Sequence, residues 1–224
     1  MTVPFEEGSF LSLLTTDEVD ELRRKATRRR YRRDSTLILQ GDRSDTVQFV
    51  LTGRVKASHL TPDGKDVVLA VRGPGTIVGE QSAFDAGPRS ATVTALDPVE
   101  TLVTAGEAFR DFVARHPGVA LVLLATMSRR LRQADGKRVE YSAYDIPGRV
   151  ARLLLELSRE YGEAFDGAIK IGLPLSQEEL AGWVGASRVA VSKALRLLRV
   201  RGAIETRYRA ILVLDTDALE QLAT

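Results

Sequence analysis

The sequence contains no cysteine. That absence excludes disulfides, thiolate zinc sites, iron–sulfur clusters and cysteine nucleophiles. Histidine is almost as scarce, because His59 and His116 are the only examples. Isolated histidines without cysteine make a poor metal site. We therefore expect no metal, no haem-based sensing and no covalently bound cofactor.

Long apolar runs are also missing. No stretch reaches the roughly 18 consecutive apolar residues that suggest a membrane-spanning helix. The N-terminal segment MTVPFEEGSF lacks the basic start and apolar core of a signal peptide. We expect a cytoplasmic protein without membrane contact. Its 44% of hydrophobic and 28% of charged residues, over 224 positions, suffice for a folded core.

Signatures of catalysis are absent as well. The sequence shows no plausible nucleophile–base pair, no metal constellation and no glycine-rich phosphate loop in front of a helix. We therefore expect a binding protein rather than an enzyme. The net charge of +2 is compatible with a nucleic-acid partner but does not by itself indicate one.

One basic segment stands out in the first part of the chain. Residues 23–33, RRKATRRRYRR, contain arginine and lysine without any acidic residue. Such a run is usually a solvated or disordered face or an interaction arm. At this point a solvated face and an arm that contacts a partner both remain open.

Short β-branched runs dominate the sequence between positions 36 and 104. They follow a helix predicted over residues 11–27 and are separated by turn signals rich in glycine, proline and aspartate. Many short strands at this spacing predict a β-sandwich, jelly roll or barrel. The predicted strands are residues 36–39, 47–51, 55–60, 67–71, 77–78, 91–95 and 99–103.

A helical stretch follows over residues 107–144, with a short first helix that ends near Pro117. Apolar positions in its second part alternate by four and three, which is the spacing of a two-stranded coiled coil. We interpret this stripe as a dimer seam, and the alternative is a helix packed on its own barrel. The seam consists of Ala120, Leu124, Met127, Leu131, Ala134 and Arg138, followed by Tyr141.

Residues 145–148, DIPG, indicate a hinge or domain boundary. An amphipathic helix over 150–161, a loop over 162–167 and a strand over 168–173 are predicted next. We therefore divide the chain into a β-barrel domain (1–115), a dimerisation helix (116–144) and a C-terminal domain (145–224).

Residues 174–202 predict a helix-turn-helix. Ser176 and Glu179 form a capping box that begins one helix, Gly185 suits a tight turn, and Ser187 caps a second helix that continues to about Val200. Such a second helix presents its N-terminal part to the major groove of DNA.

The polar face of this second helix suits DNA. Arg188 lies in the first turn, where a bidentate contact to guanine is geometrically feasible, and a basic hairpin around residues 207–209 suits a wing. The alternative is a helical hairpin with a solvated basic face. The predicted DNA-binding residues are Ser176, Gln177, Ser187, Arg188, Val189, Ser192, Lys193, Arg196, Arg207 and Arg209.

Residues 77–93, IVGEQSAFDAGPRSATV, combine a glycine, a carboxylate, an arginine and a hydroxyl. Glu80 suits a ribose hydroxyl, whereas Arg89 and Ser90 suit a phosphate, beside the close backbone approach that Gly79 permits. By composition alone this is a weak signal, since an exposed Arg-Ser turn is commoner than a nucleotide pocket.

Several stretches together resemble the cyclic-AMP receptor protein (CRP/FNR) family of bacterial transcription regulators. The resemblance covers about residues 10–215. It rests on the PDGK run within 51–69, the GE…RSA cassette at 79–91, RRL at 129–131, DIPGRVA at 145–151 and LSQEELAGWVGASRVAVSKAL at 175–195.

The resemblance implies an α+β protein with an N-terminal cyclic-nucleotide-binding-like β-barrel (jelly roll), a long dimerisation helix and a C-terminal winged helix-turn-helix. It implies a homodimeric, sequence-specific DNA-binding regulator that meets RNA polymerase and is allosterically modulated by a cyclic nucleotide or related small effector. The implied effector-binding residues are Gly79, Glu80, Gln81, Arg89, Ser90, Ala91, Ala134 and Asp135.

Some positions depart from the family pattern. Ala134 and Asp135 stand where the family usually has a hydroxyl residue followed by a small polar one, and Gln81 stands at a commonly apolar position. These departures count against cyclic AMP and leave open a different nucleotide, or a regulator with a degenerate pocket that needs no ligand. Val189 stands where a glutamate usually follows the arginine of the DNA-binding helix.

Overall fold

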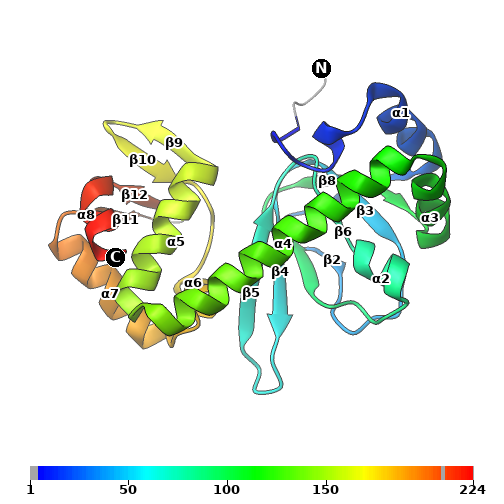
Figure 1. The fold of residues 1–224 in the computed structure, drawn as a ribbon. Coiled ribbons are helices and arrows are strands. Elements are labelled where there is room, and N and C mark those ends of the chain that lie inside the picture. Colours follow the sequence, from blue (N-terminus) through cyan, green and yellow to red (C-terminus); the bar gives the residue numbers. More distant parts are fainter. Residues whose placement is uncertain (1–4, 208–209, 224) are drawn as a thin grey trace. The chain divides into compact units, whose positions relative to one another are not determined.

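The computed structural model describes residues 5–207 and 210–223. The chain forms two compact units that divide between Arg132 and Gln133. The long helix α4 (Pro117–Ala143) contributes to both units, because the division falls within it (Figure 1). Each unit is described separately below. The three-part division at residues 115 and 144 remains a prediction.

The first unit contains two antiparallel four-stranded sheets, in the strand orders β1-β8-β3-β6 and β2-β7-β4-β5. This arrangement confirms the predicted cyclic-nucleotide-binding-like β-barrel. The strands are β1 (Thr27–Tyr31), β2 (Thr36–Ile38), β3 (Val47–Thr52), β4 (Val55–Leu60), β5 (Asp66–Arg72), β6 (Ile77–Val78), β7 (Thr92–Ala95) and β8 (Val99–Thr104).

Strand β3 shows why this unit has two hydrophobic clusters. Alternate side chains of a strand point to opposite faces. Val50 belongs to a cluster with residues of both sheets, including Ile38 and Val93. Phe49, by contrast, belongs to a second cluster on the outer face, which also contains Phe109. The strand is therefore buried on both faces.

Three helices cover that outer face: α1 (Thr16–Lys25), α3 (Gly106–Arg115) and the first part of α4 (Figure 1). The cluster beneath them includes Phe10, Phe49, Phe109 and Phe112, and the ring centroids of Phe49 and Phe109 are 5.7 Å apart. Such edge-to-face pairs add to the stability gained from burial. The helices thereby fix the end of the barrel from which α4 departs.

The predicted helix over residues 11–27 is wrong at both ends. A 3₁₀ turn (Leu11–Leu13) precedes α1, and β1 begins directly after it at Thr27. The second half of the basic run is thus a paired strand, which corrects the disordered interpretation of that half. Antiparallel pairing with β8 and an ion pair of 3.0 Å between Arg28 Nε and Glu100 Oε1 stabilise it. Arginine is not a strand signal, so the sequence alone does not reveal this strand.

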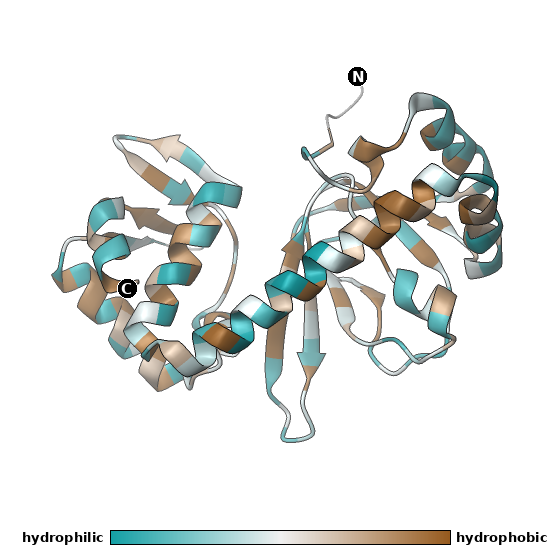
Figure 2. Cartoon of the chain, in the orientation of Figure 1, coloured by the Kyte–Doolittle hydropathy of each residue, from teal (hydrophilic) through white to brown (hydrophobic). Residues whose placement is uncertain are grey.

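Helix α4 begins at Pro117, as predicted, because proline is favoured in the first turn of a helix. Val119, Leu123 and Thr126 are buried in the first unit. Leu124 and Leu131 are 63% exposed, and Figure 2 shows hydrophobic residues concentrated in the N-terminal half of this helix. One face of α4 therefore packs on its own barrel, while other apolar side chains face outward.

The second unit is built around α5 (Ile146–Tyr161) and one antiparallel sheet in the order β11-β12-β10-β9. Its remaining elements are α6 (Gln177–Val184), α7 (Arg188–Val200) and α8 (Thr216–Leu222). The strands are β9 (Gly162–Phe165), β10 (Ala168–Ile171), β11 (Ile204–Arg207) and β12 (Ala210–Val213).

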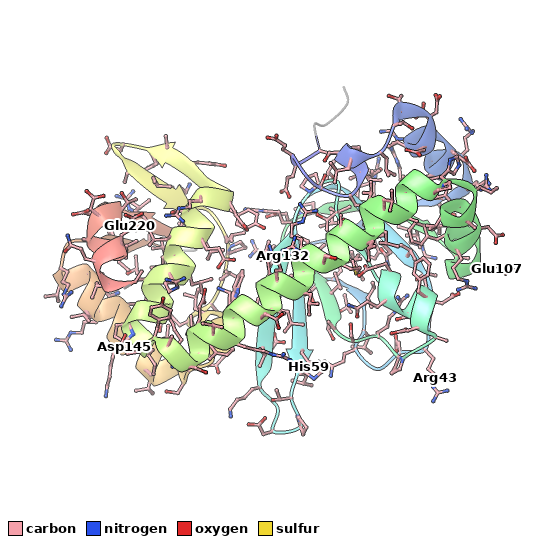
Figure 3. All side chains as sticks on the ribbon, viewed as in Figure 1. Arg43, His59, Glu107, Arg132, Asp145 and Glu220 are labelled. Atoms are coloured by element: carbon pink, nitrogen blue, oxygen red, sulfur yellow. The ribbon has the colours of Figure 1, made fainter. Side chains whose placement is uncertain are left out.

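Residues 162–165 form β9, paired with β10, rather than the predicted loop. The chain does break at the start of 145–148: α4 ends at Ala143, and α5 begins at Ile146. Asp145, labelled in Figure 3, caps α5, because its side chain accepts a hydrogen bond of 2.8 Å from the Gly148 N–H. The last turns of α4 pack in the same unit. Lys137 Nζ lies 2.7 Å from Glu156 Oε2, and the Tyr141 hydroxyl donates to the Trp183 carbonyl.

Candidate functional site

The connection between α6 and α7 is built as predicted. The Ser176 hydroxyl accepts from the Glu179 N–H at 3.1 Å, and the Glu179 carboxylate accepts from the Ser176 N–H at 2.8 Å. Gly185 ends α6 in the left-handed region with a φ of 62°, which glycine adopts without strain. The Ser187 hydroxyl then caps α7 by accepting from the Ala190 N–H at 3.2 Å. Two short helices thus meet at a tight, fully capped turn.

Helix α7 is amphipathic. Val191, Ala194, Leu195 and Leu198 are buried and form its inner face. Its other face is polar and accessible, and the helix contains no acidic residue. The exposed residues are Ser187 at the cap and then Arg188, Val189, Ser192, Lys193, Arg196, Arg199 and Val200.

The charge of this face is not neutralised locally. Arg188, Lys193 and Arg196 form no ion pair with any other residue in 5–207 and 210–223. The positive end of the helix dipole lies at the same terminus as Arg188. A cationic helix surface beside the positive end of a helix dipole is suited to an anionic groove. Ser176 and Gln177, at the start of α6, are exposed too.

The β11–β12 hairpin differs in part from the expected free basic wing. Arg207 Nε lies 2.8 Å from Glu205 Oε1, and the Arg207 guanidinium lies 5.4 Å from the Phe165 ring centroid. Hydrogen bonding to Glu205 raises the pKa of Arg207. Arg207 therefore has a partner that the sequence pattern did not suggest. Tyr208 and Arg209 lie outside the described residues.

The second candidate site lies in the first unit, around α2 (Glu80–Asp85). Gly79 precedes this helix with a φ of 79°, and a Cβ atom here would lie 2.7 Å from Arg89 Nη1 and 2.9 Å from the Thr46 carbonyl oxygen. Only glycine fits this position without displacing its neighbours. The close approach brings Arg89 against the start of α2.

Arg89 is 3% exposed and donates to the loop that surrounds it. It makes hydrogen bonds of 2.6 Å to the Gly79 carbonyl, 2.6 Å to the Thr46 carbonyl and 3.2 Å to the Ser44 hydroxyl. Burial lowers the pKa of Arg89, and nearby carboxylates, led by Asp45, oppose that shift. A buried cation of this kind is suited to a phosphate.

Glu80 is 4% exposed and pairs with Arg130 of α4, whose Nη1 lies 2.8 Å from Glu80 Oε1. Arg130 Nη2 also donates to the Ile77 carbonyl at 2.7 Å. The second oxygen of Glu80, Oε2, has no hydrogen-bond partner among the described residues. A buried carboxylate oxygen without a donor is suited to a ligand hydroxyl.

The remaining cassette residues gather at the same place. The exposed Ser90 hydroxyl donates to Gln81 Oε1 at 2.7 Å. The Ser90 carbonyl oxygen lies 3.0 Å from Nδ1 of His59, a residue of β4 that is labelled in Figure 3. Ala91 follows, half-buried. The fold thus brings together Gly79, Glu80, Gln81, Arg89, Ser90 and Ala91.

Ala134 and Asp135 belong to the other unit. Both are exposed, and Asp135 Oδ1 lies 3.5 Å from Arg138 Nη1. Their assignment to the effector site remains a prediction. Arg130, by contrast, contacts Glu80 although sequence reasoning did not select it. The available signal was its spacing from Val119, Leu123 and Thr126, which places it on the inner face of α4.

The structure shows no metal site and no membrane span in the part of the chain it describes. No group of three or more His, Cys, Asp or Glu side chains within 5–207 and 210–223 is arranged to hold a metal ion. None of the helices described there is long and apolar enough to cross a membrane.

These features define a class: a protein with a cyclic-nucleotide-type barrel, a long helix and a winged helix-turn-helix. Residues 28–116 match the cyclic nucleotide-binding domain family, and residues 148–222 match the Crp-like helix-turn-helix domain family. The chain belongs to the CRP/FNR family of DNA-binding transcription regulators.

Individual relatives agree with this assignment. The chain is 34% identical, over 86% of both chains, to the CRP-like cAMP-activated global transcriptional regulator of Mycobacterium tuberculosis. It is 32% identical, over 94% of both chains, to the cyclic AMP receptor protein of Thermus thermophilus. The fold is similar to that of the c-di-GMP responsive regulator CLP of Xanthomonas campestris, with a TM-score of 0.82 and 23% identity over 90% of this chain and 100% of that one. These relatives are transcription regulators, not enzymes.

The Glu80–Arg130 pair generates the first prediction. Arg130→Leu leaves a buried carboxylate without its cation and is expected to destabilise the first unit by about 3–5 kcal/mol. Arg130→Leu combined with Glu80→Leu should cost clearly less, because no uncompensated charge remains. Differential scanning calorimetry of the two variants and of Glu80→Leu measures the coupling. Strictly additive effects would contradict a direct pair.

Proposed function

We propose that the protein is a dimeric, sequence-specific DNA-binding regulator whose DNA affinity is set by an effector of the nucleotide class. The proposal of DNA binding rests on the exposed cationic face of α7, which follows the capped helix α6. We infer no enzymatic activity for the chain. RNA polymerase is the partner through which the bound regulator acts on transcription.

Each DNA contact has a distinct role in this proposal. Arg188 makes a bidentate contact to guanine O6 and N7 from the first turn of α7, and the neighbouring Val189 and Ser192 also face the bases. Contacts to phosphates position the helix without selecting a sequence. The phosphate contacts are assigned to Ser176, Gln177, Ser187, Lys193 and Arg196, with Arg207 and Arg209 on the wing.

Dimerisation occurs through the outward face of α4. Leu124 and Leu131 of the proposed seam are each 63% exposed, whereas Met127 packs in part against the outer-face cluster of its own chain. Exposed large apolar side chains that recur along one helix favour a helical partner, and a second copy of the same helix is self-complementary. Two α7 helices must then lie about 34 Å apart to contact successive major grooves. The proposed seam is Ala120, Leu124, Met127, Leu131, Ala134 and Arg138.

The effector proposal rests on the buried groups of the cassette. Glu80 Oε2 is free to accept from a ribose hydroxyl, and Arg89 and Ser90 are placed to bind a phosphate. Related proteins are named for cyclic AMP in Mycobacterium tuberculosis and Thermus thermophilus, and for c-di-GMP in Xanthomonas campestris. A cyclic nucleotide is therefore the proposed ligand class. Ala134 and Asp135 complete the set as proposed contacts to the base.

In this proposal, α4 couples effector binding in the first unit to the DNA affinity of the second unit. The helix makes an ion pair with Glu80 through Arg130 and, within the second unit, another with Glu156 through Lys137. A ligand that competes with Arg130 for Glu80 acts directly on the helix that both units share. A ligand that binds one arrangement of α4 more tightly than another shifts the population toward the arrangement that it binds more tightly.

A second candidate function is a regulator that is active without any ligand. Arg89 already donates to three neighbours, and Glu80 already has a cation, so the cassette is largely satisfied by the protein itself. Cellular abundance would then control such a regulator. The titration described below distinguishes the two candidates.

DNA binding is tested by selection from random duplexes with the full chain, both without nucleotide and with cyclic AMP, cyclic GMP or cyclic di-GMP present. We expect an enriched site with two-fold symmetry. Arg196→Ala should weaken binding to all sequences alike and reduce the slope of log affinity against log salt by about 1. Arg159→Ala removes an exposed arginine elsewhere in the same unit and should leave the slope unchanged. Failure to enrich any sequence would refute the proposal.

Effector binding is tested by isothermal titration calorimetry with cyclic AMP, cyclic GMP and cyclic di-GMP. We expect micromolar binding of at least one of them, lost in Arg89→Ala because the phosphate partner is removed. Arg24→Ala, an exposed arginine of α1, is the matched control and should bind like the unmodified protein. Absence of binding heat with all three would favour the ligand-independent regulator.

The dimer is tested by analytical ultracentrifugation. Leu124→Glu places a charge in the proposed seam and should shift the protein to monomers, because the charge would be buried without a partner. Leu69→Glu is the control, because it makes the same leucine-to-glutamate change at a residue of β5 that is 52% exposed and lies outside the seam. The Leu69→Glu protein should remain dimeric. A Leu124→Glu protein that stays dimeric would place the interface elsewhere.

A further inference from the structure

One exposed side chain of α7 has no explanation in folding. Val189 is 65% exposed in the first turn of the helix. The buried face of α7 consists of Val191, Ala194, Leu195 and Leu198, so Val189 adds nothing to the core. Valine is also a weaker helix former than alanine or arginine, because its branched side chain loses rotamer freedom. Neither packing nor helix propensity accounts for an apolar residue here.

Its position within α7 is specific. Val189 follows Arg188 directly, and Ser192 and Lys193 lie three and four residues further on, which places them beside Val189 on the helix surface. All four side chains are exposed. Val200 is the other exposed large apolar residue of α7, at the opposite end of the helix. Val189 is therefore the exposed large apolar residue of the N-terminal half, and it lies among the proposed DNA-binding residues.

The chemistry of the major groove restricts what this valine is able to contact. Base edges there present hydrogen-bond donors and acceptors, and the thymine C5-methyl is the only apolar group among them. Valine neither accepts from cytosine N4 nor donates to guanine. Placed against those groups it leaves them without a hydrogen bond, whereas against a thymine methyl it buries apolar surface.

We propose that Val189 determines specificity by direct contact with one thymine methyl group in each half-site. The inference rests on the proposed DNA-binding function and extends it to a particular base. Arg188 fixes the neighbouring position through guanine, and Val189 selects thymine beside it. The selected group is the 5-methyl itself, so 5-methylcytosine in the same strand position supplies the same contact.

The experiment removes that methyl without changing base pairing. The half-site is defined by selection with the full chain, and each thymine in it is replaced singly by deoxyuridine. Fluorescence anisotropy at one fixed salt concentration measures the affinity of every duplex. We expect one position at which uracil weakens binding about 4-fold, the effect of burying one methyl-sized group. The remaining thymines should show little change.

Two variants assign the effect to the residue. In Val189→Ala the 4-fold thymine–uracil difference should disappear at that one position, because the side chain no longer reaches the methyl. Val200→Ala, which is 79% exposed on the same helix, should preserve the difference in full. Both substitutions are at exposed positions, and alanine is a good helix former, so both proteins should fold.

The outcomes separate this inference from the function on which it rests. A selection that enriches no sequence overturns DNA binding and this inference together. A selected site without any uracil-sensitive thymine overturns the inference alone. A thymine–uracil difference that persists in Val189→Ala also overturns it, because another group must then contact the methyl.

Discussion

The ion pair between Glu80 and Arg130 attaches α4 to the 79–91 cassette of the first unit, and the proposed coupling to DNA depends on it. A carboxylate buried to this degree requires a cation, and α4 supplies it. The pair fixes α4 beside the cassette, while Lys137 and Tyr141 hold the end of the same helix in the second unit. Different residues of one helix thereby contact the 79–91 cassette in the first unit and α5 and α6 in the second. In the proposed function, a ligand that changes the environment of Glu80 acts on that helix.

The helix-turn-helix was predictable almost residue by residue, for a physical reason. Its ends are fixed by local hydrogen bonds from Ser176, Glu179 and Ser187, which depend only on residues a few positions away. The inner face of α7 follows from apolar spacing. Strands β4 and β6 likewise match their predicted bounds, because β-branched runs and flanking turns are local signals.

What could not be predicted depends on contacts between distant residues. Strand β1 is rich in arginine and is a strand only because β8 pairs with it and Glu100 compensates Arg28. Strand β9 similarly exists by pairing with β10. Arg130 was not selected as a site residue because its partner lies far away in sequence, and Glu205 was not expected beside Arg207.

The measurement that tests the account most directly is thermodynamic linkage between the two sites. The DNA affinity of the full chain is measured without and with saturating cyclic AMP, cyclic GMP or cyclic di-GMP, and each nucleotide affinity is measured without and with saturating DNA. The account predicts that one nucleotide changes the DNA affinity, and that DNA changes the affinity for that nucleotide by the same factor. A nucleotide that binds the cassette and leaves DNA affinity unchanged would contradict it.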